Sequence, residues 1–253
     1  LASVPPAAAS SAGTALAGTT ENKPRWKRGI SLVDGSVGES LGKLYVEKHF
    51  PPESKERMEK LVANLLAACR ESIDAIDWMA PQTKREAQAK LALFTPKIGY
   101  PKRWIDYSTL DIRKDDLVGN VARAREFAWN RDVSKLGKPV DRDEWFMTPQ
   151  TVNAYYNANM NEIVFPASVL QVPLFDPRAD DAANYGAIGA TIGHEISHGF
   201  DDTGSQYDGD GRLRNWWTDA DRKAFAALGE RLVHQFDAYE PVPGHKVNGK
   251  LTL

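Results

Sequence analysis

The segment TIGHEISHGFDD, residues 191–202, constrains the fold more strongly than any other part of the sequence. Two histidines, His194 and His198, stand four positions apart, and Glu195 follows the first of them. Residues four apart lie on one face of an α-helix, one turn from each other. The spacing therefore predicts a helix through this segment, with both imidazole rings on the same face.

The same spacing predicts a metal site. Both imidazoles can direct a ring nitrogen toward one point about 2 Å away, which is the Zn–N distance in proteins. Glu195 is rotated by about 100° from His194, so it flanks the metal and can accept a proton from a water that zinc activates. Asp201, seven residues after His194, can accept the second ring N–H of a histidine ligand. The alternative is two surface histidines on an ordinary helix, which the apolar, glycine-rich lead-in IGATIG disfavours.

Composition excludes several other classes of protein. The 32 basic and 34 acidic residues nearly balance, so there is no electrostatic case for binding nucleic acid or an anionic membrane. A membrane span needs a run of about 18 apolar residues, and the sequence has none. Cys69 is the single cysteine, so no internal disulfide forms, which fits a reducing compartment or an exported protein without disulfides. Residues 1–21, rich in Ala, Ser, Pro and Gly, predict a flexible leader or linker.

The front half of the sequence predicts helices. Apolar residues recur at steps of three and four over 53–78, and a second helix begins at Pro81 and runs to residue 94. Glycine and proline in KIGYPKRW predict a loop over 97–104. A third helix is expected over 115–131, because two aspartates at its start complement the helix dipole. Residues 22–138 are therefore predicted to be a mainly helical region.

The back half, residues 139–253, predicts a mixed structure. Residues 148–170 are rich in Val, Tyr, Phe and Ile, broken by Asn and Pro, which indicates short strands and turns. One helix is expected over 181–202, and a final helix after Thr218, with Asp221 three positions on as in a capping box. The DGDG sequence at 208–211 favours a tight turn over a calcium loop, because Gln206 and Trp217 stand where such a loop needs acidic ligands. The predicted fold class is α+β, mainly α.

The sequence also resembles a known family at the level of whole segments. VNAYYNANMNEIVFPASVLQ, IGATIGHEISHGFDDTGSQYDGDGRLRNWW and VNGKLTL are similar to segments of the neprilysin and endothelin-converting-enzyme family of zinc endopeptidases, most closely its bacterial oligopeptidase members. LYVEKHFPP and KLALFTPKIGYP resemble the family's helical region. The resemblance runs from about residue 22 to the end of the sequence.

This resemblance implies a fold and a reaction. The fold would be a thermolysin-like zinc-peptidase core with its H-E-x-x-H helix, over residues 139–253, together with part of a helical lobe. One Zn²⁺ would be bound by His194 and His198, with Glu195 as the catalytic base and Asp201 behind a ligand histidine. The expected activity is hydrolysis of small to medium peptides.

The resemblance also implies residues that contact the substrate. Asn153 and Ala154 match the family's Asn-Ala pair, which hydrogen-bonds the backbone of a bound peptide. Val169, Ala190 and Thr191 fall where the family lines its pocket for the residue after the scissile bond. These side chains are smaller or more polar than the large apolar ones expected there, so the pocket's preference stays open.

The family's third zinc ligand is a glutamate in a Gly-Glu-Asn-x-x-Asp segment, and no such segment occurs up to Leu253. We therefore expect a C-terminal segment or a second chain to complete the site. The resemblance further implies peptide substrates and an extracytoplasmic location, either periplasmic, at the cell surface or secreted. The alternative is a non-catalytic protein, the peptide-binding or structural half of a split or nicked enzyme.

Overall fold

A computed structural model describes residue 18 and residues 21–253, so most of the predicted leader, 1–21, lies outside the described residues. The chain forms two compact units, residues up to 44 with 103–141, and residues 45–102 with 142–253. The division predicted from sequence, after residues 21 and 138, stays a prediction. Among the described helices, none combines the length and apolar character needed to cross a membrane.

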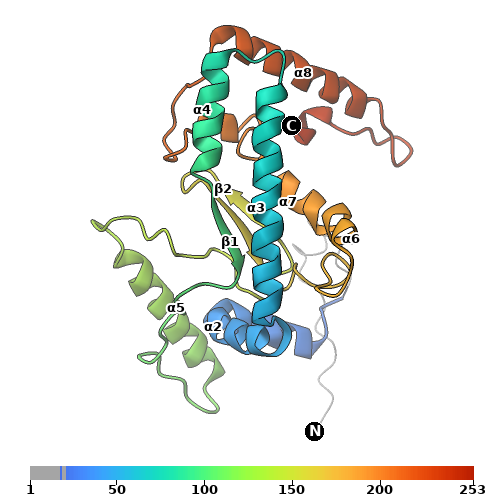
Figure 1. Ribbon diagram of the computed structural model, residues 1–253. Coiled ribbons are helices and arrows are strands. Elements are labelled where there is room, and N and C mark those ends of the chain that lie inside the picture. Colours follow the sequence, from blue (N-terminus) through green and yellow to red (C-terminus); the bar gives the residue numbers. More distant parts are fainter. Residues whose placement is uncertain (1–17, 19–20) are drawn as a thin grey trace. The chain divides into compact units, whose positions relative to one another are not determined.

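Helices dominate both units (Figure 1). The first unit contains α5 (Leu117–Val133) and most of α2 (Arg25–His49). The elements of the second unit are α3 (Pro52–Ala75), α4 (Pro81–Ala92), β1 (Thr95–Gly99), β2 (Tyr155–Asn157), β3 (Glu162–Pro166), α6 (Asp181–Gly186), α7 (Ile188–Ser197), α8 (Asp219–Asp237) and the 3-10 turns η1 (Gly204–Gln206) and η2 (Gly249–Thr252). The predicted class, α+β and mainly α, is confirmed.

In the first unit, α5 begins two residues later than the predicted residue 115, with Asp116 as its N-cap. The side chain of Asp116 accepts a hydrogen bond from the backbone N–H of Gly119 at 3.0 Å and caps the helix. α2 is not predicted, because its large apolar residues do not form one buried stripe, and Trp26 and Ile30 are exposed. The helix is kinked at Val37 (φ −139°, ψ 41°).

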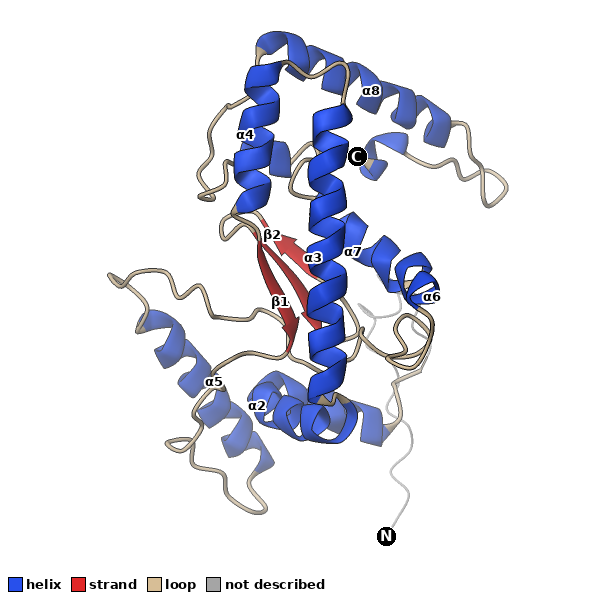
Figure 2. Cartoon of the chain, in the orientation of Figure 1, coloured by secondary structure: helices blue, strands red, loops and turns tan. Residues whose placement is uncertain are grey.

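The sheet of the second unit has the strand order β1-β3-β2 (Figure 2). β1 runs parallel to β3 and β2 runs antiparallel to it, so β2 is an edge strand. All five residues of β3 are buried. The predicted loop over 97–104 is wrong at its start, because Lys97, Ile98 and Gly99 belong to β1. Lys97 looks like a surface residue in the sequence, but it is buried in an ion pair with Glu162 (2.5 Å).

Helix α3 lies along the sheet and against α7 (Figure 2). The apolar residues that recur at steps of three and four in the sequence form its buried face, including Met58, Leu61 and Val62. On α7, Ile192 and Ile196 are buried one turn apart. Burying one such side chain stabilises the fold by about 1.5–3 kcal/mol. The burial of these two isoleucines therefore fixes α7 against the core.

The single helix predicted over 181–202 is two helices, α6 and α7, which break at Ala187 (φ −99°, ψ −86°). The break has a long-range cause. The N–H of Ile188 donates to the carbonyl of Leu174 instead of continuing the helical pattern. The side chain of Asn184 exchanges two hydrogen bonds with the backbone of Asp176, at 3.0 and 2.9 Å. The second helix also ends earlier than predicted, at Ser197.

The predicted cap of α8 forms, with an additional role for its carboxylate. Thr218 Oγ1 accepts from the backbone N–H of Asp221 at 3.2 Å, as in a capping box. The carboxylate of Asp221 does not bond back to the N–H of Thr218. It accepts from the N–H of Ala80 (3.0 Å) and the hydroxyls of Thr83 (2.5 Å) and Thr218 (2.7 Å). One buried carboxylate therefore joins the N-termini of α4 and α8.

The apolar stripe of α8, formed by Phe225, Leu228, Leu232 and Phe236, is only partly buried. Phe225 packs against Trp217 and Trp78, with ring centroids 5.3 and 6.5 Å away, and the two tryptophan rings stack on each other at 6.3 Å. Leu228 and Leu232 are exposed by 40% and 38%. The stripe therefore anchors the helix at its N-terminal end.

We predict that Asp221→Ala lowers the free energy of unfolding by about 2–3 kcal/mol at pH 7, because it leaves one buried and two partly buried donors unsatisfied. Burial alone would raise the pKa of Asp221, but hydrogen bonds from Thr83, Thr218 and Ala80 lower it below its ordinary value. A lowered folded-state pKa stabilises the fold above the unfolded-state pKa of about 3.9. The difference between the two proteins should therefore shrink as the pH falls below 4.

Urea unfolding followed by tryptophan fluorescence measures this effect. Asp219→Ala is the matched control, since Asp219 lies exposed in the same first turn and should contribute less than about 1 kcal/mol through the helix dipole. Equal losses in the two variants would contradict the role given to Asp221.

Candidate metal centre

Helix α7 brings the two predicted histidine ligands together. Nε2 of His194 and Nε2 of His198 are 3.0 Å apart, and the ring centroids are 4.4 Å apart. Two imidazole nitrogens bound tetrahedrally to one zinc at about 2.0–2.1 Å would lie about 3.3–3.4 Å apart. The rings therefore need to separate by only a few tenths of an ångström to share a zinc ion. His194 is exposed and His198 is half-buried, so the pair is open on one side.

Asp201 lies behind the second histidine. Its Oδ2 is 2.7 Å from Nδ1 of His198. Because a carboxylate can only accept, the proton belongs on Nδ1 and the lone pair of Nε2 stays available. Asp201 arrives there through a turn and not along the helix face, because α7 has already ended at Ser197.

The carboxylate of Asp201 is itself held by the turn that follows. Its Oδ1 accepts from the backbone N–H of Thr203 at 3.0 Å and of Gly204 at 2.6 Å. Gly204 has no room for a side chain, since an added Cβ would lie 1.8 Å from the carbonyl oxygen of His198. The close approach of this turn to the end of α7 therefore requires glycine.

Glu195 is in a different environment from the histidines. It is buried, with 6% of its surface exposed, and the backbone N–H of Tyr156 in β2 donates to its carboxylate. Burial raises the pKa of Glu195, while His194, His198 and that N–H act in the opposite direction. A carboxyl group with a raised pKa is a better proton acceptor at neutral pH than an ordinary one.

A third ligand is not found near the histidines. Over residue 18 and residues 21–253, the structure gathers no group of three His, Cys, Asp or Glu side chains that could hold a metal ion. The chemistry of the two imidazoles fits zinc. The third ligand from another segment stays a prediction.

The residues expected to bind the substrate lie on α7 and next to the strands β2 and β3. Asn153 and Ala154 directly precede β2, the edge strand, and β2 contacts α7. Asn153 is exposed, and its Oδ1 accepts from the N–H of Ala154 at 2.9 Å. Thr191 is partly exposed on α7, one turn before His194, whereas Val169 is buried after β3. Their roles in binding stay predictions.

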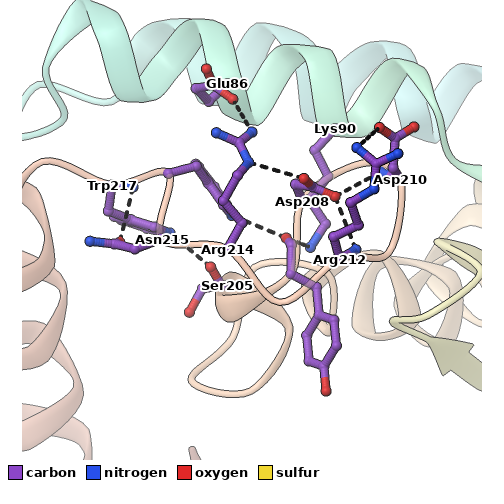
Figure 3. A network of polar contacts seen from close by, with 11 residues as sticks. Glu86, Lys90, Ser205, Asp208, Asp210, Arg212, Arg214, Asn215 and Trp217 are labelled. Atoms are coloured by element: carbon purple, nitrogen blue, oxygen red, sulfur yellow. Dashed lines mark hydrogen bonds and ion pairs between the residues drawn. The ribbon is translucent and has the colours of Figure 1, made fainter.

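The turn at 208–211 is confirmed as a structural turn. Oδ1 of Asp208 accepts from the N–H groups of Asp210 and Arg212, both at 3.0 Å. Its Oδ2 accepts from Nε of Arg214 at 3.0 Å, and Arg214 also contacts Glu86 on α4 at 2.8 Å (Figure 3). Arg212 forms a further ion pair with Asp210 at 3.5 Å, so two arginines neutralise the acidic side chains here.

Lys90 is a buried residue of α4 that was not predicted as part of the site, and its ammonium group donates to the carbonyls of Gly204 and Tyr207. A sequence signal existed, because Lys90 follows Ala87 by three positions and precedes Leu91, both of which are buried. A lysine on the apolar face of a helix is uncommon enough to indicate a specific partner.

A helix that carries H-E-x-x-H, with both Nε2 atoms converging and the glutamate buried beside an edge strand, is the arrangement of zinc-dependent metallopeptidases. Comparison with protein families agrees. Models described as peptidase family M13 match residues 5–101 and 153–253. The chain belongs to peptidase family M13. The match begins at residue 5, so the resemblance starts earlier than the predicted residue 22.

Three relatives show how far the similarity extends. The crystal structure of the zinc metalloprotease ZMP1 of Mycobacterium tuberculosis in complex with an inhibitor is 57% identical, with a TM-score of 0.88 over 95% of this chain and 37% of that chain. Neprilysin of Mus musculus is 36% identical over 94% of this chain and 33% of its own length. Endothelin-converting enzyme 1 of Mus musculus is 38% identical over 91% and 31%. The chain spans about a third of these proteins.

We predict that Asp201→Asn weakens zinc binding by about 10–100-fold, the usual loss when the partner of a ligand histidine is removed. The amide can no longer accept as a charged group, so Nδ1 of His198 is held less strongly. Competition with a chromophoric chelator measures the dissociation constant.

Asp202→Asn is the control. The carboxylate of Asp202 is adjacent in sequence and makes only a 3.5 Å contact with the hydroxyl of Thr203. Zinc binding that is equally weakened in both variants, or in neither, would contradict the role of Asp201.

Proposed function

We propose that this chain provides the catalytic helix of a zinc-dependent endopeptidase that hydrolyses small to medium peptides. The observation that carries the proposal is the pair of Nε2 atoms 3.0 Å apart, with Asp201 behind one ring and the buried Glu195 beside both. Membership of peptidase family M13 supports it.

The roles of the residues follow from their positions. His194 and His198 would hold the ion, and Asp201 would keep the proton of His198 on Nδ1. Zinc, when bound, supplies a Lewis acid that polarises the scissile carbonyl and lowers the pKa of water. Glu195 would accept the proton of the attacking water on its carboxylate and pass it to the leaving nitrogen.

The edge strand would position the substrate. β2 is an edge strand of the sheet and contacts α7, and an extended peptide can pair with backbone groups along such an edge. We propose that Asn153 and Ala154 begin this pairing. Val169, Ala190 and Thr191 would then line the pocket for the residue after the scissile bond, and their small size favours a roomy pocket.

The remaining parts of the proposal rest on the family resemblance. A glutamate from a Gly-Glu-Asn-x-x-Asp segment outside residues 1–253 would be the third zinc ligand. The expected partners are peptides, and the expected location is extracytoplasmic.

We predict that Glu195→Gln in the complete protein retains zinc and lowers kcat for a fluorogenic peptide by at least about 10²–10⁴-fold, the usual contribution of a general base. The substitution preserves shape and burial but removes the proton acceptor. Zinc content and peptide hydrolysis are measured on the same preparation.

Ser197→Ala is the control, because Ser197 is exposed on the same helix and its hydroxyl donates only to the carbonyl of His194. It should retain both zinc and turnover within about twofold, since a lost surface hydrogen bond costs little. Near-normal turnover of Glu195→Gln with zinc bound would refute the general-base assignment.

A further inference from the structure

The turn after α7 directs its carbonyl groups inward. The carbonyls of Gly204, Ser205 and Tyr207 accept hydrogen bonds from side chains. The indole N–H of Trp217 donates to Ser205 at 3.1 Å, and that of Trp216 donates to Tyr207 at 3.0 Å. This turn also carries the N–H groups that hold Asp201.

Lys90 is the one charged donor among these side chains. With 2% of its surface exposed, it donates from Nζ to the carbonyl of Gly204 at 2.7 Å and to that of Tyr207 at 2.8 Å (Figure 3). Its ammonium group also lies 5.7 and 5.6 Å from the ring centres of Tyr156 and Phe200. A charged donor makes stronger hydrogen bonds than a neutral one.

The backbone of α4 is held at the same point. The carboxamide of Asn161, between β2 and β3, donates to the carbonyl of Lys90 at 3.0 Å and to that of Gly209 at 3.2 Å. Asn161 also accepts from the hydroxyl of Tyr156 at 3.0 Å. The backbone of Lys90 is therefore held in a fixed position in the core.

Gly204 links this lysine to the histidine pair. Its carbonyl accepts from Lys90, while its N–H donates to Oδ1 of Asp201 at 2.6 Å. Oδ2 of the same carboxylate contacts Nδ1 of His198 at 2.7 Å. An unbroken series of short hydrogen bonds thus runs from α4 to a metal-binding imidazole.

Burial of a lysine without a carboxylate in direct contact costs free energy. Here the buried ammonium group donates hydrogen bonds to two backbone carbonyls. Burial lowers the pKa of Lys90 to about 8, while Asp201 and Asp208 act to raise it. An apolar residue would fill the same space at a lower desolvation cost. The feature that an apolar residue lacks is the ability to position Gly204.

We propose that Lys90 is a positioning residue for the metal site, which orients the Gly204 turn so that Asp201 holds His198 ready to bind zinc. The proposal rests on the proposed function in one respect, that His198 is a zinc ligand. The proposal adds Lys90 to the residues of the site, although Lys90 lies more than a hundred positions before His198 in the sequence. Lys90 would act through Gly204 and Asp201, without contacting metal or substrate.

The test is zinc affinity in the complete protein, measured by chelator competition. Lys90→Met retains the volume but removes the donor, and it should weaken zinc binding by about 10–100-fold, as loss of an outer partner of a ligand usually does. Because Lys90 acts through Asp201, Lys90→Met combined with Asp201→Asn should bind zinc no more weakly than Asp201→Asn alone.

Two controls separate positioning from general stability. Trp216→Phe removes a hydrogen bond to the same turn but leaves the link through Gly204, so its zinc affinity should change by less than about threefold. Asp221→Ala destabilises the junction of α4 and α8 without touching the turn, and its zinc affinity should also be retained. If Lys90→Met does not fold, Lys90→Arg is measured in its place, and its displaced donors should also weaken zinc binding, by at least about threefold.

Unchanged zinc affinity in the folded Lys90 variant would overturn the proposal, as would additive losses in the double variant. The outcome is independent of catalysis. A protein that binds zinc without hydrolysing peptides would refute the proposed function alone, and a zinc-dependent peptidase indifferent to Lys90 would refute this inference alone.

Discussion

The contact between Asp201 and Nδ1 of His198 is the interaction on which the candidate site depends. An imidazole offers either of two nitrogens to a metal, and the partner of one decides the availability of the other. At 2.7 Å, the carboxylate oxygen leaves Nε2 directed toward Nε2 of His194. Backbone N–H groups of the turn after α7 hold that carboxylate, and side chains such as Lys90 hold the turn. The geometry of the site therefore depends on the packing of the second unit and not on the helix alone.

The helix contributes through its opposite face. Ile192 and Ile196 are buried and stand one turn apart, two positions before each histidine. Two helical positions correspond to a rotation of about 200°, so burial of the isoleucines directs His194 and His198 toward the open side. Glu195 lies between these faces and is buried beside β2, where desolvation makes it a stronger base.

Much of this site could be predicted from sequence because its signals are local. Residues that are spaced like His194, Glu195 and His198 take the same relative positions in any α-helix. The contact of Asp201 with a histidine was also predicted, although the chain reaches it through a turn and not along the helix. Strands β2 and β3 and the cap at Thr218 also follow from short-range patterns.

The features that sequence did not predict depend on distant partners. The break before α7 needs the carbonyl of Leu174, and the strand at Lys97 needs β3 and Glu162. The position of Lys90 beside Ala87 and Leu91 indicates a buried lysine, but its partners, the carbonyls of Gly204 and Tyr207, are more than a hundred residues away in the sequence. In each case the decisive interaction joins segments that a local pattern cannot relate.

Anomalous X-ray diffraction at the zinc absorption edge, on crystals of the complete protein, tests most directly whether the histidine pair on α7 is a zinc site. We predict one strong peak about 2.0–2.1 Å from Nε2 of both His194 and His198, with Asp201 on Nδ1 of His198 and Glu195 outside the coordination sphere. A zinc peak elsewhere, binding through Nδ1 of His198, or no zinc at this pair in crystals of active protein would contradict it.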